Sequence, residues 1–318
     1  MTKGTVCIVG GTGFVGHAIA EQLYEAGYQV TIISRHRERH RDLLVLPTVR
    51  VINGDVFDYA FLTHEFAGKD IVINLVGILN EGKAWTQKFH VAHIQLTELV
   101  SEACRVAGVK RLLHMGALHA TEKAPSKYLR TKARAENIAH AAASKNLKVT
   151  SFRPSTIFGQ RDSFLNRFSR LLNLVPYIFP LASGNARMQP VYVRDVAKCF
   201  VRAIGNYRTY GQRYDLCGPK VYTLKQIVEY VAFLRRRRVR VIALGTFLSW
   251  MQARFLQMVP GKPFSVDNYL SLKVDSVCHK GFPNVFGIKP VEMEEIAPTY
   301  VTPDLHNAWD EYRSDIHD

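Results

Sequence analysis

Two residues four positions apart, Tyr128 and Lys132 in the stretch YLRTK, have the types and spacing needed to exchange a proton with a substrate oxygen. On a helix that begins near Ser126, positions i and i+4 share one face. An ammonium beside a phenol lowers the tyrosine pKa from about 10, so the sequence predicts that Lys132 activates Tyr128. The ammonium would also be able to bind the ribose hydroxyls of a dinucleotide.

The same spacing occurs at Tyr269 and Lys273, so the spacing alone is weak evidence. Position in the chain separates the two pairs. Tyr128 follows the fifth predicted strand of a nucleotide-binding fold, whereas Tyr269 falls in the C-terminal third. We therefore predict that Tyr128 and Lys132, and not the second pair, line a cofactor site.

A third group needed for carbonyl chemistry is missing. Twelve residues before Tyr128, where a reductase with such a pair needs a hydroxyl, the chain has Gly116. Loss of a preorganised donor typically costs about 3 kcal/mol, or roughly 100- to 1000-fold in rate. Ser126 is near in sequence but is predicted to cap the helix. The sequence predicts weak or no turnover and intact cofactor binding.

The stretch VGGTGFVG lies between the first predicted strand and the first predicted helix. Gly10, Gly13 and Gly16 would let backbone amides and the helix N-terminus approach a pyrophosphate closely, and Thr12 and Phe14 lie in the same loop. The strand before and the helix after it are the context that this motif requires. The alternative is a plain tight turn.

The end of the second predicted strand indicates which dinucleotide binds. An NAD-preferring site would have an acid there to hold the ribose hydroxyls. The chain has Ser34 and Arg35 instead, followed by Arg37, Arg39 and Arg41. A guanidinium suits the additional ribose phosphate of NADP(H), so we predict NADP(H) in preference to NAD(H). The alternative is a solvated basic loop.

Three more residues are assigned to the cofactor by position alone. Asp55 follows the third predicted strand and would accept a hydrogen bond from the adenine amine. Asn74 and Gly77 follow the fourth, near the expected nicotinamide ribose. Each of the three could simply be a turn residue.

The elements that must position these groups alternate along the first two-thirds of the chain. Helical stretches at 89–107 and 126–144 separate buried β-branched runs, which predicts an α/β fold: a Rossmann-type, doubly wound parallel sheet with a smaller C-terminal lobe. Residues 188–193 look like a return to the sheet before a helix at 194–204. The predicted strands are 5–9, 29–33, 49–53, 70–75, 111–115 and 148–152.

The predicted domain boundaries follow from where this alternation of strands and helices stops and resumes. Residues 1–160, with about 188–216, form the NADP(H)-binding domain, and residues 161–187 and 217–302 form the smaller lobe. Residues 303–318 are polar and acidic enough for a loose tail.

The formal net charge of +15 favours an anionic partner, such as a phosphate-bearing cofactor, an acidic protein or a membrane surface. No nucleic-acid recognition motif is visible, and we predict no such partner. The five scattered cysteines predict buried thiols in a reducing compartment. We see no leader peptide and no apolar run of about 18 residues, which predicts a soluble or peripheral protein.

One stretch outside the cofactor site, residues 234–260, combines a basic cluster with an apolar helical stripe. Such a combination can lie on an anionic membrane surface or dock on a partner. The alternative is a stripe that packs inside the C-terminal lobe. The basic residues are Arg235 to Arg238 and Arg240, and the stripe is Leu244, Phe247, Leu248, Met251, Phe255 and Met258.

His90 and His93 share a helical face, but no third ligand lies nearby in the sequence. Packed or solvated histidines are the better interpretation, and we predict no metal site.

With these residues assembled, the chain resembles the extended and atypical short-chain dehydrogenase/reductases, which are epimerase/dehydratase-like. More narrowly, it is similar to the dehydrogenase-like accessory subunits of respiratory complex I and their bacterial relatives. The residues that carry the resemblance are GGTGFVG, YLRTKARAE, FRPSTIFGQRDSFLNRF and QPVYVRDVAK. The first two stretches are general for the superfamily, and the last two are more specific to this branch.

The resemblance implies a tightly held NADPH with a structural role, with Tyr128 and Lys132 facing its nicotinamide end and Pro154 and Ser155 flanking the nicotinamide. It also implies a respiratory-chain complex or an anionic membrane surface as partner. Because no transit peptide is visible, we expect a bacterial member of this group, in the cytoplasm or peripheral on the inner face of the cell membrane. The leading hypothesis is therefore an NADP(H)-binding assembly component. The alternative is an active NADP(H)-dependent reductase or sugar-nucleotide epimerase/dehydratase that uses Tyr128 and Lys132.

Overall fold

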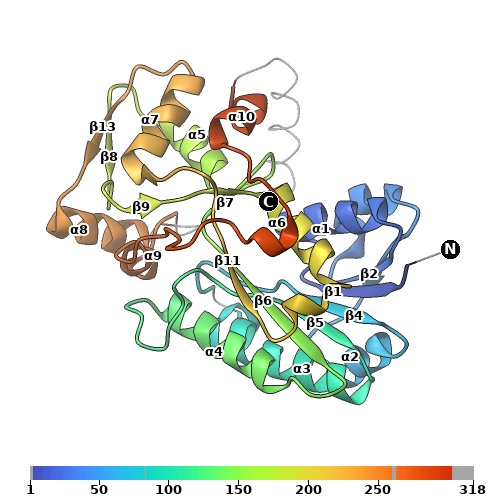
Figure 1. Ribbon diagram of the computed structural model, residues 1–318. Coiled ribbons are helices and arrows are strands. Elements are labelled where there is room, and N and C mark those ends of the chain that lie inside the picture. Colours follow the sequence, from blue (N-terminus) through green and yellow to red (C-terminus); the bar gives the residue numbers. More distant parts are fainter. Residues whose placement is uncertain (1–2, 83, 260–262, 303–318) are drawn as a thin grey trace. The chain divides into compact units, whose positions relative to one another are not determined.

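The computed structural model describes residues 3–82, 84–259 and 263–302 (Figure 1). The chain divides into two compact units. Of the described residues, unit 1 contains those within 3–154, 193–216 and 278–289, and unit 2 contains those within 155–192, 217–277 and 290–302. The predicted tail, 303–318, lies outside the described residues.

Unit 1 is built on a seven-stranded sheet in which every strand pairs parallel with its neighbours, in the order β11-β6-β5-β4-β1-β2-β3. The β-branched runs are buried, as expected for a parallel sheet covered on both faces. This confirms the predicted fold class and all six predicted strands. The strands are β1 (Thr5–Val9), β2 (Gln29–Ser34), β3 (Val49–Asn53), β4 (Ile71–Asn74), β5 (Arg111–Met115), β6 (Lys148–Pro154) and β11 (Arg213–Leu216).

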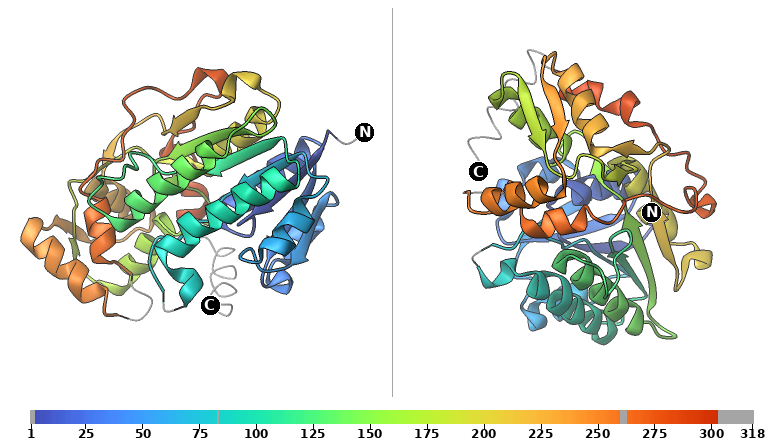
Figure 2. Two further views of the ribbon diagram at one scale, coloured as in Figure 1. Left: turned by 90° about the horizontal axis from the view of Figure 1, so that it is seen from below. Right: turned by 90° about the vertical axis from the view of Figure 1, so that its left-hand side faces the viewer.

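Helices cover both faces of this sheet (Figures 1 and 2). On one face, α2 (Tyr59–Phe66), α3 (Leu96–Val106) and α4 (Lys127–Ala141) lie side by side; on the other, α1 (Phe14–Glu25) packs against α6 (Val193–Ala203). The core between sheet and α3 is apolar and includes Val72, Leu96 and Leu112. Short helical turns complete the unit: η1 (Arg37–Arg39), η2 (Arg41–Val45), η3 (Trp85–Gln87), the π-helical η4 (His90–Gln95), η5 (Tyr207–Thr209) and η6 (Asn284–Phe286).

Unit 2 has its own core, which includes Phe158, Leu172 and Ile227. Three two-stranded sheets flank it: β7 with β10, β9 with β12, and β8 with β13. Its strands are β7 (Ile157–Phe158), β8 (Ile178–Leu181), β9 (Arg187–Met188), β10 (Val191–Tyr192), β12 (Tyr222–Thr223) and β13 (Arg240–Ala243). Its helices are α5 (Leu165–Leu174), α7 (Leu224–Leu234), α8 (Thr246–Leu256), α9 (Val266–Ser271), α10 (Met293–Ile296) and α11 (Pro298–Val301).

Two predictions are wrong. Residues 188–193 do not rejoin the main sheet, because β10 pairs with β7 of unit 2; the seventh strand of the main sheet is β11. The helix predicted at 194–204 is confirmed as α6. Cys7, Cys104 and Cys199 are buried free thiols, as predicted, but Cys217 and Cys278 are disulfide-bonded.

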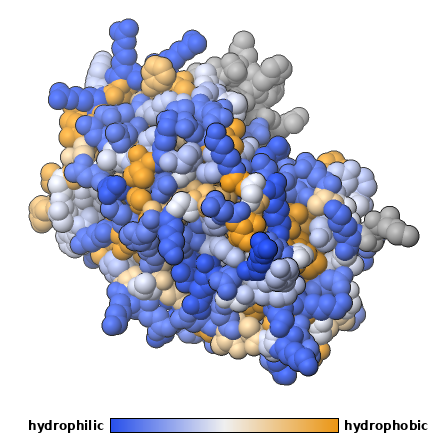
Figure 3. Space-filling view, in the orientation of Figure 1, coloured by the Kyte–Doolittle hydropathy of each residue, from blue (hydrophilic) through white to orange (hydrophobic). Residues whose placement is uncertain are grey.

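The apolar stripe of α8 does not pack inside its unit, so that alternative is also wrong. The residues of α8 that are buried are Ser249 and Ala253. The large apolar side chains point outward: Phe247, Leu248, Trp250, Met251, Phe255 and, just beyond the helix, Met258 are all exposed. Figure 3 shows hydrophobic surface at the left-hand edge, over α8. Within the described residues, no helix is both long and apolar enough to cross a membrane.

Candidate dinucleotide site

Two positions of the glycine loop between β1 and α1, Gly10 and Gly16, have no room for a side chain. Gly10 has a φ of +82°, and a Cβ there would lie 3.0 Å from Val76 Cγ2. A Cβ at Gly16 would lie 2.4 Å from the carbonyl oxygen of Gly11. Gly13 is the N-cap of α1, with no side-chain cap and no acid in the first turn. The first amides of α1 and the positive end of its dipole therefore suit an anionic ligand.

The end of β2 carries no carboxylate. Ser34 is buried, and its Oγ accepts a hydrogen bond from the backbone N–H of His36 at 3.2 Å. Arg35 and Arg37 are exposed at the start of the segment that follows. A guanidinium there can bind a phosphate, while the acid that would bind two ribose hydroxyls is missing.

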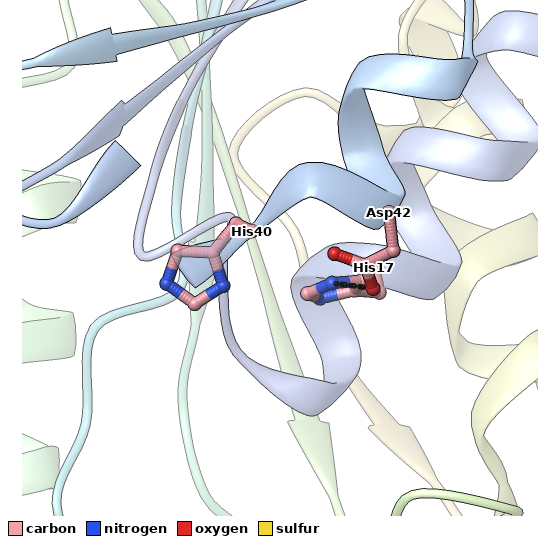
Figure 4. Close-up of side chains that lie close together, drawn as sticks. All are labelled: His17, His40 and Asp42. Carbon is pink, nitrogen blue, oxygen red and sulfur yellow. Dashed lines mark hydrogen bonds and ion pairs between the residues drawn. The ribbon is translucent and has the colours of Figure 1, made fainter. Parts of the chain in front are cut away.

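A hydrogen bond between side chains fastens this basic segment to α1 (Figure 4). His17 Nε2 lies 3.0 Å from the Asp42 carboxylate in η2, and His17 Nδ1 lies 3.0 Å from the carbonyl oxygen of Gly13. The His40 ring centroid lies 6.2 Å from that of His17. The arginine-bearing segment is thus held beside the glycine loop.

Asp55 and Asn74 hold turns. The Asp55 side chain is exposed, and its Oδ1 accepts from the Phe57 N–H at 3.0 Å. Asn74 is buried; its Oδ1 accepts from the Val76 N–H at 3.2 Å, and its amide donates to Thr97 Oγ1 at 3.3 Å. These bonds favour the turn interpretation, although the exposed Asp55 carboxylate can still accept a further bond.

Gly77, by contrast, lies next to the Tyr–Lys pair. A Cβ at Gly77 would be 3.5 Å from Lys132 Nζ and 3.8 Å from His93 Nε2. The structure therefore brings together Gly77 after β4 and Lys132 on α4, 55 positions apart in the numbering.

Helix α4 begins as predicted, with Ser126 as N-cap accepting from the Leu129 N–H at 3.2 Å. Lys132 is buried, and its Nζ donates to the carbonyl oxygen of Met115 at 2.5 Å. Burial lowers the Lys132 pKa to about 8. Burial also raises the pKa of Tyr128 to about 12. The prediction that Lys132 lowers the pKa of Tyr128 is wrong for this form of the protein, because desolvation dominates at the phenol.

An ion pair lies beside the position of the missing hydroxyl. A Cβ at Gly116 would lie 3.2 Å from Arg153 Cγ, 3.3 Å from Glu136 Oε1 and 3.3 Å from the carbonyl oxygen of Phe152. Glu136 is buried on α4, and Arg153 binds it through two nitrogens, with Nη2 2.7 Å from Oε2. A Cβ at position 116 would require Arg153, Glu136 or the Phe152 backbone to move by a few tenths of an ångström.

The two residues expected to flank the nicotinamide fall in different units. Pro154 ends β6 in unit 1, where its carbonyl oxygen accepts from the Leu118 N–H at 3.2 Å. Ser155 begins unit 2, where its buried hydroxyl donates to the carbonyl oxygen of Gln189.

Two residues of the site were missed in the sequence. Glu136 lies four positions after Lys132, so the same spacing argument that pairs Tyr128 with Lys132 would have placed it on that face of the helix. His93 was considered only as a metal ligand; in the structure it packs against Tyr128 with ring centroids 5.7 Å apart. In the second pair, Tyr269 and Lys273, the tyrosine is part of the packed interior. Tyr269 is buried, and its hydroxyl donates to the carbonyl oxygen of Thr246 at 3.3 Å.

Residues 6–217 match the model of the NAD dependent epimerase/dehydratase family. The chain belongs to this family. It is 28% identical over 301 residues to NADH dehydrogenase (ubiquinone) 1 alpha subcomplex subunit 9, a mitochondrial protein of Mus musculus, covering 90% of this chain and 77% of that protein. It is also 28% identical to the ceramide reductase of Caulobacter vibrioides, covering 76% and 74%.

Among solved structures, the chain is similar to the NADPH-dependent quinone oxidoreductase of Escherichia coli in complex with NADPH. The TM-score is 0.72 at 18% identity, over 93% of this chain and 99% of that one. At this identity the likeness supports the fold. The predicted resemblance to the epimerase/dehydratase-like dehydrogenases, and more narrowly to the accessory subunits of respiratory complex I, is confirmed.

Proposed function

We propose that this chain is an NADP(H)-binding member of the epimerase/dehydratase family that acts as a structural or assembly component of a respiratory NADH dehydrogenase, with weak or no turnover. The observation that carries the proposal is the contact of Glu136 and Arg153 around Gly116. Position 116 carries no hydroxyl, and a side chain there would press on this ion pair. The dinucleotide-binding half keeps its glycine loop and its open helix N-terminus.

The state of the Tyr–Lys pair supports the same proposal. Lys132 donates its short hydrogen bond to Met115, one residue before Gly116, and the pKa of Tyr128 is raised by burial. A phenol with a pKa of about 12 is a poor acid–base catalyst near neutral pH, since the best catalytic pKa lies near the working pH.

The preference for NADP(H) rests on Arg35 and Arg37 at the end of β2. Arg35→Ala should weaken NADPH binding by roughly 10- to 100-fold, because a hydrogen bond to a charged group contributes about 1.5–3 kcal/mol, while NADH binding should hardly change. Titration calorimetry with both dinucleotides measures this. Arg208→Ala removes an exposed arginine from another part of unit 1 and is the matched control. Tighter binding of NADH than NADPH, unaffected by Arg35→Ala, would refute the preference.

The relative in Mus musculus is named as a subunit of NADH dehydrogenase (ubiquinone), and this similarity supports association with such an assembly. Attachment at the inner face of a bacterial cell membrane is part of the proposal. It is supported by the exposed apolar face of α8 and by Arg236, Arg237 and Arg238, which are exposed in the same unit. An apolar helix face and exposed arginines in the same unit suit an anionic membrane surface.

Native fractionation of membranes from the source cells tests the proposed role. We expect the chain to migrate with a large NADH:quinone oxidoreductase assembly and to carry NADPH at a stoichiometry near one. Migration as a free species would favour the second function, an NADP(H)-dependent reductase or sugar-nucleotide epimerase/dehydratase. The shared face of Tyr128 and Lys132 on α4 and the similarity to ceramide reductase support that alternative. Carbonyl turnover that is abolished by Tyr128→Phe would establish it.

A further inference from the structure

His93 lies in an uncommon piece of helix next to the Tyr–Lys pair. It belongs to the π-helical turn η4, which leads directly into α3. Single π-helical turns are rare and occur often at functional sites. His93 is 1% exposed, whereas His90 at the start of the same turn is exposed. The two histidines are thus in different environments, although the sequence put them on one face.

The hydrogen bonds of the His93 ring define its tautomer. The backbone N–H of Ile78 donates to Nε2 at 3.1 Å, so Nε2 carries no proton. Nδ1 must then carry the proton of the neutral ring, and it donates to Thr131 Oγ1 at 2.8 Å. The Thr131 hydroxyl has one proton of its own, which it can donate to the carbonyl oxygen of Lys127 or Tyr128, at 2.9 and 3.0 Å.

The neutral ring is also the form that its surroundings favour. Burial, and after it the charge of Lys132, lower the pKa of His93 to about 3. A protonated ring would lose the hydrogen bond from Ile78, because Nε2 could then only donate. His93 therefore does not serve as a proton donor at neutral pH. It connects the backbone after β4 to α4.

The ring also completes an aromatic wall. It stacks on Phe89 with ring centroids 5.5 Å apart and meets the edge of Tyr128 at 5.7 Å, with an interplanar angle of 79°. Its Nε2 lies next to the position where a Cβ of Gly77 would be, as does Lys132 Nζ. One side chain thus touches the turn after β4, the π-helical turn and α4.

We propose that His93 is a positioning residue that holds the Gly77–Ile78 backbone against Tyr128 and Lys132, and so shapes the pocket for the nicotinamide-ribose half of the dinucleotide. The ligand rests on the proposed function, but the hold on Ile78 is a property of the protein without ligand. His93 acts through the backbone it fixes.

The test combines amide hydrogen exchange at Ile78 in the ligand-free protein with NADPH titration calorimetry. His93→Phe keeps a ring beside Phe89 and Tyr128 and removes both hydrogen bonds. We expect exchange at Ile78 to rise about tenfold and NADPH affinity to fall about tenfold, the size of one lost hydrogen bond. His93→Gln offers an amide oxygen to the Ile78 N–H and should restore part of both. His90→Phe, on the same turn but exposed, should match the wild type.

Two results would overturn the proposal. Unchanged exchange at Ile78 in His93→Phe would show that the ring does not hold this backbone. Faster exchange with unchanged NADPH affinity would show that the hold does not shape the pocket. If His93→Phe fails to fold, Thr131→Val carries the comparison, because it removes the acceptor of His93 Nδ1 and leaves the ring in place. Wild-type protein that does not bind NADPH refutes the proposed function, and the exchange at Ile78 then decides the role of His93 separately.

Discussion

The Lys132 ammonium is fixed by one hydrogen bond and still has donors to spare. Nζ donates one of its three protons to the carbonyl oxygen of Met115, which leaves two N–H groups for a ribose hydroxyl or another acceptor. A dinucleotide could therefore bind Lys132 without breaking the bond to Met115. In our proposal the lysine serves cofactor binding, and the missing hydroxyl at position 116 is what limits turnover.

Position 116 gives a direct test of this view. Gly116→Ser should not create turnover, because its Cβ would press on Arg153 and Glu136. Overpacking of this kind costs about 1–3 kcal/mol, so the free energy of unfolding should fall by about that amount. Urea denaturation measures the loss, and NADPH oxidation with carbonyl and quinone substrates measures turnover.

Gly205→Ala is the control for this substitution, because a Cβ at Gly205 would meet no atom within 4 Å. Its free energy of unfolding should stay within about 0.5 kcal/mol of the wild type. A Gly116→Ser protein of unchanged stability that reduces a carbonyl would contradict our interpretation and show that the site lacks only its hydroxyl.

At the scale of elements, hydrogen bonds hold α8 in place, so its large apolar side chains are not needed for packing and remain exposed. The Ser249 hydroxyl accepts from the Ser183 N–H at 3.0 Å and donates to the carbonyl oxygen of Leu244 at 3.1 Å. The amide of Gln252 donates to the carbonyl oxygen of Pro180 at 2.8 Å. A helix anchored in this way can expose a hydrophobic face without losing its place on the β8–β13 sheet.

We expect the double substitution Phe247→Ser and Phe255→Ser to release the protein from anionic vesicles. Both side chains are 69% exposed, so the fold should lose little stability. Burying each phenylalanine in a membrane surface is worth up to about 1.5–3 kcal/mol, so vesicle affinity should fall at least tenfold. Cosedimentation with phosphatidylglycerol vesicles measures it.

Tyr207→Ser serves as the control, since Tyr207 is an equally exposed aromatic residue of unit 1 and should not alter vesicle binding. If the double variant cosediments as strongly as the wild type, α8 does not contact the membrane.

The elements were predictable where the chain repeats a strong pattern. The β-branched runs gave the strands of the main sheet up to β6, and the glycine loop gave the start of α1. The prediction failed at residues 188–193, because a two-residue strand such as β10 can pair with whichever backbone lies near it. The carbonyl oxygen of Met115 and the Glu136–Arg153 pair act on the site through space, and hydrophobic periodicity carries no signal for either.

At the scale of the whole molecule, a protein with a formal charge of +15 keeps several titratable groups neutral inside unit 1. His93 and His114 are each 1% exposed, and both ring nitrogens of His114 lack a hydrogen-bond partner among the described residues. His140 is half-buried, with Nε2 2.9 Å from Ser151 Oγ. Each ring is easier to protonate in the unfolded chain than in the fold, because burial penalises the charged form.

This arrangement predicts acid sensitivity with a definite sign. Burial lowers the pKa of His93 to about 3 and that of His140 to about 4, and lowers that of His114 as well, from an unfolded value of about 6.5. Below pH 6.5 the unfolded chain gains protons that the fold does not. The stability contributed by the neutral rings is therefore complete above that pH and is lost as the pH falls toward the folded values.

Urea denaturation between pH 7.5 and 5 should show the free energy of unfolding falling by up to about 1.4 kcal/mol per pH unit for each of the three histidines. His140→Gln should make the decrease per pH unit smaller by up to about 1.4 kcal/mol, because one of the three histidines no longer takes up a proton on unfolding. The glutamine keeps a polar side chain near Ser151. His64→Gln changes a histidine whose side chain is 83% exposed and should leave the slope as it is. A free energy of unfolding that does not change between pH 6.5 and 5 would mean that these rings are already charged in the folded protein. The assignment of His93 as a neutral ring protonated at Nδ1 would then be wrong.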